Sequence, residues 1–331
     1  MEPIKFKGFL VEEHEDGFIR SIKTRTISDL PGNDLLIKVR YSSLNYKDAL
    51  SASGNKGVTK NYPHTPGIDA VGTVVDSDSK KFHENERVIV TSYDLGMNTD
   101  GGFGQYIRVP SEWAVKLPEG MSMKESMIIG TAGLTAGMSV LRLTEYIKPE
   151  QGKVVVSGAT GGVGSISVAI LAKLGFKVSA ISGKQEDHDF LFKLGAVEVI
   201  ERKDFEQENT RPIMKAVFAG GIDTVGGSIL DNIIKSTQSM GVVTCCGNVA
   251  SAKLNLTVFP FILRGVSLIG IDSQNYPMKY REVVWNKLAK DWKLENLMNV
   301  CTEISFAELS DHIDLILDGK IKGRVVLDLE A

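Results

Sequence analysis

The first third of the chain alternates apolar and polar residues in short runs that glycine and proline interrupt. Five such runs have the two-residue period of half-buried strands: DLLIKVRYSSL, GIDAVGTVV, NERVIVTS, GGFGQYIRV and WAVKLP. Long stretches with a helical period are scarce in this part of the chain. The pattern therefore predicts a β-rich domain at the N-terminal end.

From about Met121 onward the pattern changes, and helix-length segments alternate with short apolar runs. The segments SISVAILAKLG and EDHDFLFKLGA each end in Leu-Gly, which is a common way for a helix to end. Strand–helix alternation of this kind predicts an α/β fold with a doubly wound parallel sheet. The final runs, CTEISF and RVVLDL, return to the character of the first domain. Strands of the parallel sheet are expected at residues 153–158, 177–182, 197–200, 221–226, 241–247 and 266–272.

Composition narrows the class of protein. A chain of 331 residues with 43% hydrophobic content is long enough for two domains. The formal net charge of −3, without runs of like charge, argues against nucleic acid and anionic membrane surfaces as partners. The three cysteines lack ligand-like spacing, which argues against a disulfide framework and a structural zinc site. Since we also find no secretory signal and no apolar run near the roughly 20 residues of a membrane span, we expect a cytoplasmic protein.

A glycine-rich stretch, SGATGGVG, covers Ser157 to Gly164. It follows one predicted strand and opens a predicted helix. Glycine allows the backbone to approach a pyrophosphate closely, and the N-terminus of a helix offers unpaired N–H groups and a positive dipole end. In this context the stretch predicts a dinucleotide-binding loop, whereas an isolated glycine cluster would indicate only a tight turn.

The next predicted strand ends in Ser182, Gly183 and Lys184, where a dinucleotide site often has the Asp or Glu that binds the adenosine ribose. Ser182 lies 182 − 158 = 24 residues after Gly158, close to the expected spacing of about 20. A hydroxyl, an amide and an ammonium form a small anion site, and Arg202 adds a second cation. We therefore predict NADPH as the cofactor. The alternative is a solvated turn, with NADH bound through the glycine loop alone.

Several motifs together give the chain a family resemblance. PGIDAVGTV and ATGGVG are similar to segments of the medium-chain dehydrogenase/reductase superfamily. Within it, SSLNYKDALSASGNKG, MIIGTAGLTAG, IDTVGG, PFILRGVSLIGIDS and IKGRVVL resemble the zinc-free quinone oxidoreductase group, in the branch of bacterial acrylyl-CoA reductase-like proteins. The similarity covers essentially the whole chain. It implies a GroES-like catalytic domain at residues 1–126 and 269–331, and a Rossmann NADP-binding domain at residues 127–268.

The resemblance also bears on metal binding. Zinc-dependent members of the superfamily bind catalytic zinc through residues that match Asn45, Ile68 and Thr131 in this chain. Ile68 has no ligand atom, and the four-cysteine loop of a structural zinc site is absent as well. We therefore expect no metal in the mechanism. Hydride transfer from NADPH to an activated C=C bond or to a quinone needs none.

In the resembling family, the segment LNYKD lies beside the nicotinamide. Asn45 would hold an amide or acceptor oxygen, and Tyr46 would contact the cofactor and donate a proton, unless it is simply a packed aromatic. Asp48 is expected to form structural hydrogen bonds. Related trans-2-enoyl reductases have a tyrosine acid in a Gly-Asn-Tyr-Gly segment, and here the comparable position is Lys56. Lys56 would supply positive charge to an enolate or a CoA phosphate, or is an exposed loop lysine, and water is the remaining proton donor.

Further contacts follow from the same resemblance. Arg324 is expected to reach the cofactor from the C-terminal tail, with a surface ion pair as the alternative. Lys56, Lys60 and Lys279 are candidates for holding CoA phosphates. The segment VSLIGID reads as an unpaired sheet edge, and such edges pair across a two-fold axis in this superfamily, so a homodimer through residues 261–272 is expected. The remaining cofactor contacts implied by the resemblance are Thr160, Gly161, Gly162, Val163, Asn248, Ile262 and Ser273.

These observations predict an NADPH-dependent, zinc-free oxidoreductase. Its acceptor would be an enoyl thioester such as acrylyl-CoA, or a quinone. A broad enone or aldehyde-stress reductase is the alternative among enzymes. A catalytically silent NADPH-binding protein is the alternative outside them.

Overall fold

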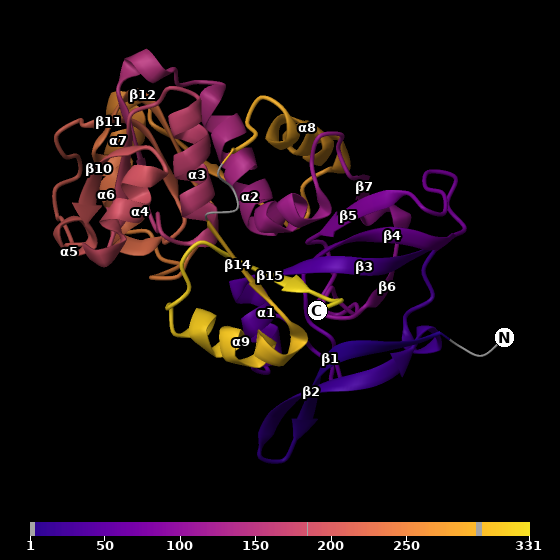
Figure 1. The fold of residues 1–331 in the computed structure, drawn as a ribbon. Helices are drawn as coiled ribbons and strands as arrows, with labels where there is room; N and C mark the ends of the chain where they lie inside the picture. Colours follow the sequence, from indigo (N-terminus) through magenta and orange to yellow (C-terminus); the bar gives the residue numbers. More distant parts are fainter. Residues whose placement is uncertain (1–3, 184, 296–299) are drawn as a thin grey trace. The chain divides into compact units, whose positions relative to one another are not determined.

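The computed structural model describes residues 4–183, 185–295 and 300–331, and the chain divides into two compact units (Figure 1). The first unit runs through Thr131 and also contains Gln274–Ala289 and the C-terminal stretch from Glu295. The second unit comprises Ala132–Ser273 and Lys290–Leu294. The boundaries fall five residues later than the expected bounds at 126 and at 268, and a short piece of the tail belongs to the second unit.

The first unit is built on a seven-stranded sheet in the order β14-β15-β3-β4-β5-β7, with β6 paired to β3. All five alternating runs of the first third contribute strands to it. The last strand, β15, pairs antiparallel with β3, so the tail completes the first unit, as its composition predicts. The strands are β3 (Leu35–Leu44), β4 (Asp69–Ser77), β5 (Arg87–Thr91), β6 (Tyr106–Val109), β7 (Ala114–Lys116), β14 (Cys301–Ile304) and β15 (Arg324–Asp328).

A separate antiparallel hairpin, β1 (Lys5–His14) and β2 (Gly17–Thr26), precedes this sheet (Figure 1). Sequence analysis missed it because its residues are half-exposed and do not alternate cleanly. Arg20 of β2 joins the hairpin to α1 (Tyr46–Ala52) and α9 (Leu309–Leu317) of the same unit. Its guanidinium donates to the Ala52 carbonyl at 3.1 Å and to the Asp314 carboxylate at 2.7 Å.

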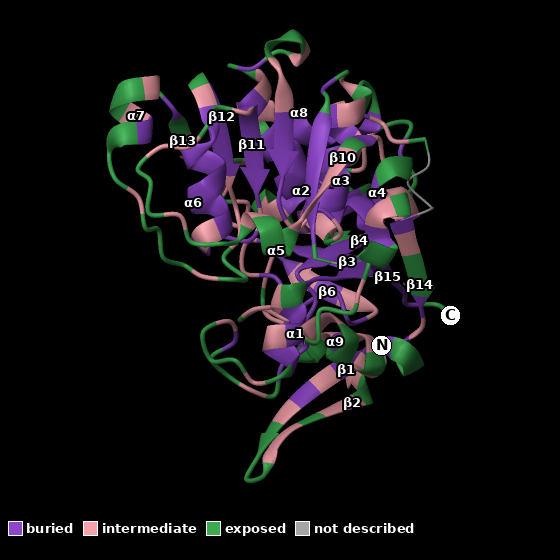
Figure 2. Ribbon diagram, turned by 90° about the vertical axis from the view of Figure 1, so that its left-hand side faces the viewer, coloured by how far each residue is buried: buried purple, intermediate pink, exposed green. Residues whose placement is uncertain are grey.

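The second unit contains a six-stranded parallel sheet in the order β10-β9-β8-β11-β12-β13. The order reverses between β8 and β11, which is the doubly wound Rossmann arrangement that the strand–helix alternation predicts. Figure 2 shows that its central strands are buried along their length. The strands are β8 (Lys153–Val156), β9 (Val178–Ser182), β10 (Ala196–Glu201), β11 (Phe218–Asp223), β12 (Thr237–Cys245) and β13 (Ser267–Gly270).

The helices of the second unit follow the expected segments. The two Leu-Gly stops are confirmed, because Gly175 and Gly195 follow the ends of α3 and α4 with positive φ angles of 85° and 99°. The second stop ends a helix shorter than expected, since residues Gln185–Asp187 form a 3₁₀ turn. The helices are α3 (Gly162–Lys173), α4 (His188–Lys193), α5 (Arg202–Phe205), α6 (Gly227–Lys235) and α7 (Phe259–Arg264).

The long helix α2 (Met123–Thr144) bends at Gly130, one residue before the boundary of the first unit. Gly130 has a φ of 50°, and a Cβ there would lie 2.5 Å from Asp69 Oδ2, so only glycine fits. By length and hydropathy α2 could cross a membrane, but 78% of the relevant window is buried, as in the core helix of a globular protein.

The first unit also contains α8 (Met278–Ala289). Further 3₁₀ turns lie at Ile27–Asp29, Ser111–Trp113, Pro149–Gln151 and Phe306–Glu308.

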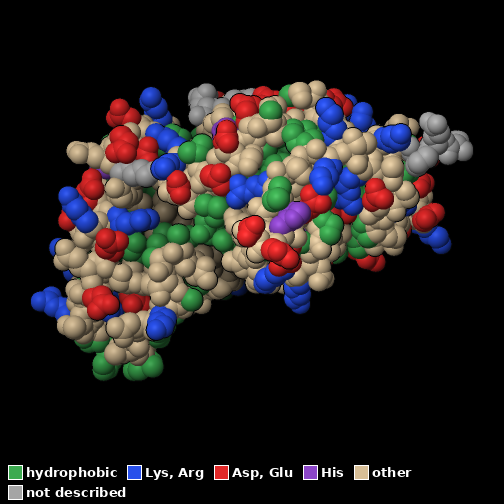
Figure 3. Space-filling view, turned by 90° about the horizontal axis from the view of Figure 1, so that it is seen from below, with side chains coloured by type: hydrophobic (Ala, Val, Ile, Leu, Met, Phe, Trp, Pro, Cys, Tyr) green, Lys and Arg blue, Asp and Glu red, His purple; other side chains and the backbone are tan. Residues whose placement is uncertain are grey.

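Acidic and basic side chains alternate over the face of the molecule that Figure 3 shows, and neither sign covers it. This mixture agrees with the small net charge of −3.

Candidate active site and cofactor site

The glycine loop lies between β8 and α3 in the second unit. Gly158 has a φ of 56°, and a Cβ there would lie 2.3 Å from Thr224 Oγ1. A Cβ on Gly164 would lie 2.2 Å from the Gly158 carbonyl, so the loop and the start of the helix are in close backbone contact. No side chain caps α3, whose N-cap residue is Gly161. The first N–H groups of the helix are thus available to a phosphate, and the loop fits a dinucleotide.

Asp223, at the end of β11, connects this loop to the neighbouring strand. Its Oδ1 accepts a hydrogen bond from Ser157 Oγ at 2.6 Å, and its Oδ2 accepts from the amides of Val225 at 3.2 Å and Gly226 at 2.8 Å. Burial raises the pKa of Asp223, and these donors oppose the shift. Sequence analysis missed Asp223, although an acid that ends an apolar run such as GGID is a recognisable signal.

Most of the predicted cofactor residues of the second unit follow the carboxyl ends of its parallel strands. These ends meet at one edge of the sheet, which is where doubly wound folds bind their ligands. The structure thus gathers these residues at what we call the nucleotide edge. They are Thr160–Val163 after β8, Ser182 and Gly183 with β9, Arg202 after β10, Asn248 after β12 and Ser273 after β13. Lys184 lies outside the described residues.

Ile262 is not at the nucleotide edge. It lies on α7, the helix that precedes β13, and its side chain is 68% exposed. Two residues later, Arg264 donates to the carbonyls of Lys235 and Thr237, both at 3.0 Å, at the opposite end of β12. The fold therefore separates Ile262 from the other cofactor residues, and we remove it from the predicted contacts.

Ser182 and Arg202 lie at neighbouring strand ends of the nucleotide edge. Ser182 is buried, whereas Gly183 and Arg202 are exposed. The Arg202 side chain lies against the Gly183 backbone, because its Cδ and Nε are 3.5 and 3.7 Å from the place where a Cβ on Gly183 would be. The Ser182 hydroxyl, the exposed Gly183 backbone and the Arg202 guanidinium are thus close together, as the prediction of a 2′-phosphate site requires.

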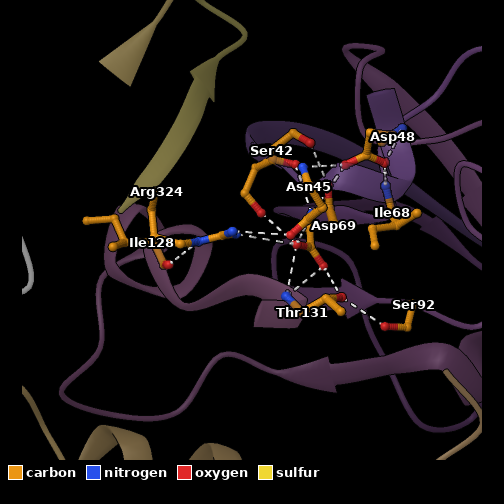
Figure 4. Close-up of polar contacts among 11 residues, drawn as sticks. Ser42, Asn45, Asp48, Ile68, Asp69, Ser92, Ile128, Thr131 and Arg324 are labelled. Atoms are coloured by element: carbon orange, nitrogen blue, oxygen red, sulfur yellow. Dashed lines mark hydrogen bonds and ion pairs between the residues drawn. The ribbon is translucent and has the colours of Figure 1, made fainter. Parts of the chain in front are cut away.

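The first unit contains a second polar site, centred on the fully buried carboxylate of Asp69 (Figure 4). Oδ2 accepts hydrogen bonds from Ser43 Oγ at 2.6 Å and from Asn45 Nδ2 at 2.8 Å. Oδ1 accepts from Thr131 Oγ1 at 2.6 Å, and the Thr131 amide also donates to the carboxylate. We call Asn45, Asp48, Asp69, Thr131 and Arg324 the Asp69 cluster.

Arg324, the first residue of β15, provides the cation of the Asp69 cluster. Its Nε donates to the Ile128 carbonyl at 2.9 Å, and its Nη1 donates to Asn45 Oδ1 at 3.2 Å. Nη2 lies 4.0 Å from Asp69 Oδ2 and has no hydrogen-bond partner among the described residues. The side chain is 4% exposed, so the alternative of a surface ion pair is wrong. Burial lowers the pKa of Arg324, and the Asp69 charge opposes this.

Asp48, in the first turn of α1, is fully buried and accepts four hydrogen bonds. Oδ2 accepts from the Asn45 amide at 2.8 Å and from its Nδ2 at 3.2 Å. Oδ1 accepts from the amides of Gly67 at 3.2 Å and Ile68 at 2.7 Å. Burial, together with the nearby Asp69 charge, raises the pKa of Asp48 to about 7. The side chain ties α1 to the segment that precedes β4, which matches the expected structural role.

The positions that resemble zinc ligands do meet in space. Asn45 and Thr131 both contact Asp69, and Ile68 precedes it in the chain (Figure 4). However, Ile68 offers no donor atom, and the Asn45 oxygen faces the Arg324 guanidinium. Within the described residues no three His, Cys, Asp or Glu side chains form a group that could hold a metal ion. The donor set does not fit zinc.

The other predicted catalytic residues lie near or away from the Asp69 cluster. Tyr46 follows Asn45 directly, at the start of α1, and is 46% exposed. The Lys56 ammonium lies 2.6 Å from Glu13 Oε2 and 4.7 Å from the centre of the Tyr62 ring, so it is held at the β1–β2 hairpin. It donates to the Lys60 carbonyl, whereas Lys279 lies over the Tyr280 ring. The structure therefore does not bring Lys56 into the cluster.

Sequence analysis missed several residues that shape this site. Lys47, next to Tyr46, donates from Nζ to Gln274 Oε1 at 2.8 Å. Ser92 has a φ of 61°, and its hydroxyl lies 2.8 Å from Thr131 Oγ1. Asp69 itself was read as part of the strand GIDAVGTVV. An acid within such an apolar run is the signal that could have identified it.

Two family models and several known proteins are similar to this chain. Residues 31–119 match the family model of the alcohol dehydrogenase GroES-like domain, and residues 162–290 match that of zinc-binding dehydrogenases. The chain is 42% identical to "Putative quinone oxidoreductase YhfP" of Bacillus subtilis, over 98% of this chain and 99% of that one. It is 36% identical to acrylyl-CoA reductase AcuI of Ruegeria pomeroyi, over 98% of this chain and 100% of that one.

Solved structures extend the comparison to bound cofactors. The crystal structure of Bacillus subtilis YhfP with NAD bound superposes with a TM-score of 0.96, covering 98% of this chain and 99% of that one. The structure of Escherichia coli K-12 YhdH with bound NADPH, 39% identical, superposes with a TM-score of 0.94 and covers 97% and 99%.

Proposed function

The chain belongs to the zinc-free quinone oxidoreductase group of the medium-chain dehydrogenases/reductases, and we propose that it reduces an α,β-unsaturated carbonyl acceptor with NADPH. It is an oxidoreductase with a nicotinamide cofactor. The proposed acceptors are an enoyl thioester such as acrylyl-CoA and a quinone, the compounds that appear in the names of the two relatives. One observation carries the proposal: the positions of the zinc ligands form a cluster around Asp69 and Arg324 that cannot hold a Lewis-acid metal.

The cofactor is proposed to bind along the nucleotide edge. When bound, the reduced nicotinamide supplies a hydride to the β-carbon of the acceptor. The backbone amides at the start of α3 would hold the pyrophosphate. Ser182, Gly183 and Arg202 would hold the 2′-phosphate, which is the reason for preferring NADPH.

In this proposal the residues near the Asp69 cluster have separate roles. Both ends of the Asn45 amide are engaged, by Arg324 and by two carboxylates, so Asn45 acts by positioning α1 rather than by binding the acceptor. Tyr46 is the exposed residue that this positioning fixes. Its phenol would donate a proton to the α-carbon of the acceptor. Lys56 is left out of the chemistry because its ammonium is paired with Glu13.

A consumption assay tests the proposed activity. NADPH oxidation is followed with acrylyl-CoA, crotonyl-CoA, benzoquinone, simple enones and simple aldehydes. We expect the highest kcat/KM with acrylyl-CoA or benzoquinone. Equal rates with all enones and aldehydes would support the broad stress reductase instead. Cofactor binding without oxidation by any acceptor would identify a silent NADPH-binding protein.

A comparison of two thioesters tests whether CoA itself is recognised. Acrylyl-CoA and the N-acetylcysteamine thioester of acrylate have the same reacting atoms, but only the first carries the nucleotide phosphates. An advantage of at least about tenfold in kcat/KM for acrylyl-CoA, or about 1.4 kcal/mol, would support a CoA site. Equal values would favour an acceptor without CoA.

We also propose a cytoplasmic homodimer. β13 is the edge strand of the parallel sheet, and among the strands that the structure describes it pairs with β12 alone. Exposed apolar side chains lie near it, on α7 and at the bend of β12, and α7 is largely exposed in Figure 2. A second copy pairing along β13 would cover them. Light scattering at micromolar concentration tests this, and a monomer would contradict it. The exposed apolar side chains near β13 are Met240, Val258, Phe259, Ile262 and Leu263.

The three cysteines are free, which supports the proposed location because disulfides are rare in the reducing cytoplasm.

A further inference from the structure

β9 ends without the Asp or Glu that often binds the adenosine ribose, but the neighbouring strand β10 ends in a carboxylate, that of Glu201. β10 runs parallel to β9, and the Cα partner of Ser182 in this pairing is Glu201. Residues that are paired in register on neighbouring strands project to the same face of the sheet. Glu201 is the last residue of β10, so its carboxylate lies beside Ser182 at the nucleotide edge.

Glu201 lies beside His188, the first residue of α4. His188 Nε2 lies 3.2 Å from Glu201 Oε1, and the side chains are 24% and 30% exposed. The Glu201 carboxylate is therefore partly exposed and accessible to a ligand. Arg202, the next residue, extends its guanidinium along the Gly183 backbone. A carboxylate and a guanidinium thus stand on adjacent residues beside the same turn.

Two other carboxylates of this sheet are already bound by other side chains or amides. Glu198, on the same strand, is bonded to Lys153 at 2.6 Å and to Ser179 at 2.7 Å. Asp223 is buried and accepts hydrogen bonds from Ser157, Val225 and Gly226. Glu201 is the carboxylate whose strand register places it next to Ser182.

We propose that Glu201 determines cofactor choice, as the carboxylate that binds the 2′-hydroxyl of NADH in competition with the preference of Arg202 for the 2′-phosphate of NADPH. This proposal rests on the proposed function, since it concerns the adenosine ribose at the same nucleotide edge. A carboxylate accepts a hydrogen bond from a ribose hydroxyl and repels a phosphate dianion, whereas a guanidinium does the reverse. The two residues together make the chain a binder of both cofactors, with NADPH bound more tightly.

Direct binding tests this without any acceptor. Dissociation constants for NADPH and NADH are measured by nicotinamide fluorescence on the full chain and on Glu201→Gln. We expect about fivefold tighter NADPH binding and about threefold weaker NADH binding, a change of about fifteenfold in their ratio. Glu198→Gln is the matched control, because it removes a carboxylate from the same strand away from Ser182. It should leave the ratio within about twofold.

Two further variants keep the test decisive if Glu201→Gln unfolds. Arg202→Ala should shift the ratio toward NADH by about tenfold, because it removes the opposing cation. Glu201→Asp should shift it toward NADPH by about threefold, because the shorter side chain withdraws the carboxylate from the ribose. An unchanged ratio in Glu201→Gln or Glu201→Asp, or an equal shift in the Glu198→Gln control, would overturn the proposal. A wild-type chain that binds both cofactors and reduces no acceptor would contradict the proposed function alone.

Discussion

The Asp69 carboxylate and the Arg324 guanidinium form a buried ion pair, with 4.0 Å between Asp69 Oδ2 and Arg324 Nη2 and side chains 0% and 4% exposed. The two residues come from strands β4 and β15, which both flank β3. The pair contacts Asn45 and Thr131, two of the positions that resemble zinc ligands. The first prediction concerns how much this ion pair contributes to stability.

Replacing Arg324 by Met should destabilise the protein by about 3–5 kcal/mol, because it leaves the Asp69 charge buried without a cation. The free energy of unfolding in urea measures this. The surface pair of Lys116 and Glu86 provides the control, and Lys116→Met should change stability by less than about 1 kcal/mol. The double variant Asp69→Asn/Arg324→Met should be less destabilised than the sum of its single changes, and strict additivity would show that the pair does not interact.

The pKa of Asp48, raised to about 7, makes stability depend on pH. A carboxyl whose folded pKa lies above its unfolded value stabilises the fold while it is protonated. That contribution is complete below about pH 4 and disappears as the pH rises through about 7. The stability of the wild type relative to Asp48→Asn should therefore fall between pH 4 and pH 8, by up to about 4 kcal/mol. Parallel pH profiles of the two proteins would contradict the shift.

Gly130 should not accept even alanine. Gly130→Ala would place a methyl group 2.5 Å from Asp69 Oδ2 and 2.9 Å from Arg324 Nη2, at a φ of 50°. We expect a loss of about 2–4 kcal/mol in the free energy of unfolding. Gly32→Ala is the control, because its Cβ would meet nothing within 4 Å. Similar losses in both variants would mean that the contact with the ion pair is not the cause.

Asp223→Asn should weaken cofactor binding more than it affects the fold. An amide in place of the carboxylate cannot accept hydrogen bonds from Ser157, Val225 and Gly226 together, so the connection between the glycine loop and the end of β11 is weakened. We expect the NADPH dissociation constant to rise about tenfold, because this corresponds to the free energy of one to two such hydrogen bonds. An unchanged dissociation constant, with normal thermal stability, would show that the loop is held by other contacts.

Tyr46→Phe tests the proposed proton donor. It removes one hydroxyl from an exposed residue, so the fold should be unaffected, while kcat on a fixed acceptor should fall at least about tenfold. Lys56→Ala should change kcat by less than about twofold, because its ammonium is paired with Glu13 at the hairpin. Full activity in both variants would leave water as the donor.

The sheets of both units were predictable because their strands carry a clear local pattern. The hairpin β1–β2 was not, since its residues are half-exposed and its anchor, Arg20, bonds to Asp314 nearly 300 residues away. The glycine loop was predictable from local sequence alone. By contrast, the Asp69 cluster depends on the register of β15 against β3, which no local pattern encodes. Glu201 was missed for the same reason, because its importance comes from the strand beside it.

The cation of the Asp69 cluster enters the chain very late. Arg324 and Asn45, which are hydrogen-bonded, are 279 residues apart, and only seven residues follow Arg324. During synthesis, the second unit is therefore complete while Asp69 still lacks its partner. The first unit cannot pair that charge with its cation until Arg324 has left the ribosome. A chain truncated before Arg324 would keep every residue of the nucleotide edge and lose the cation of the Asp69 cluster.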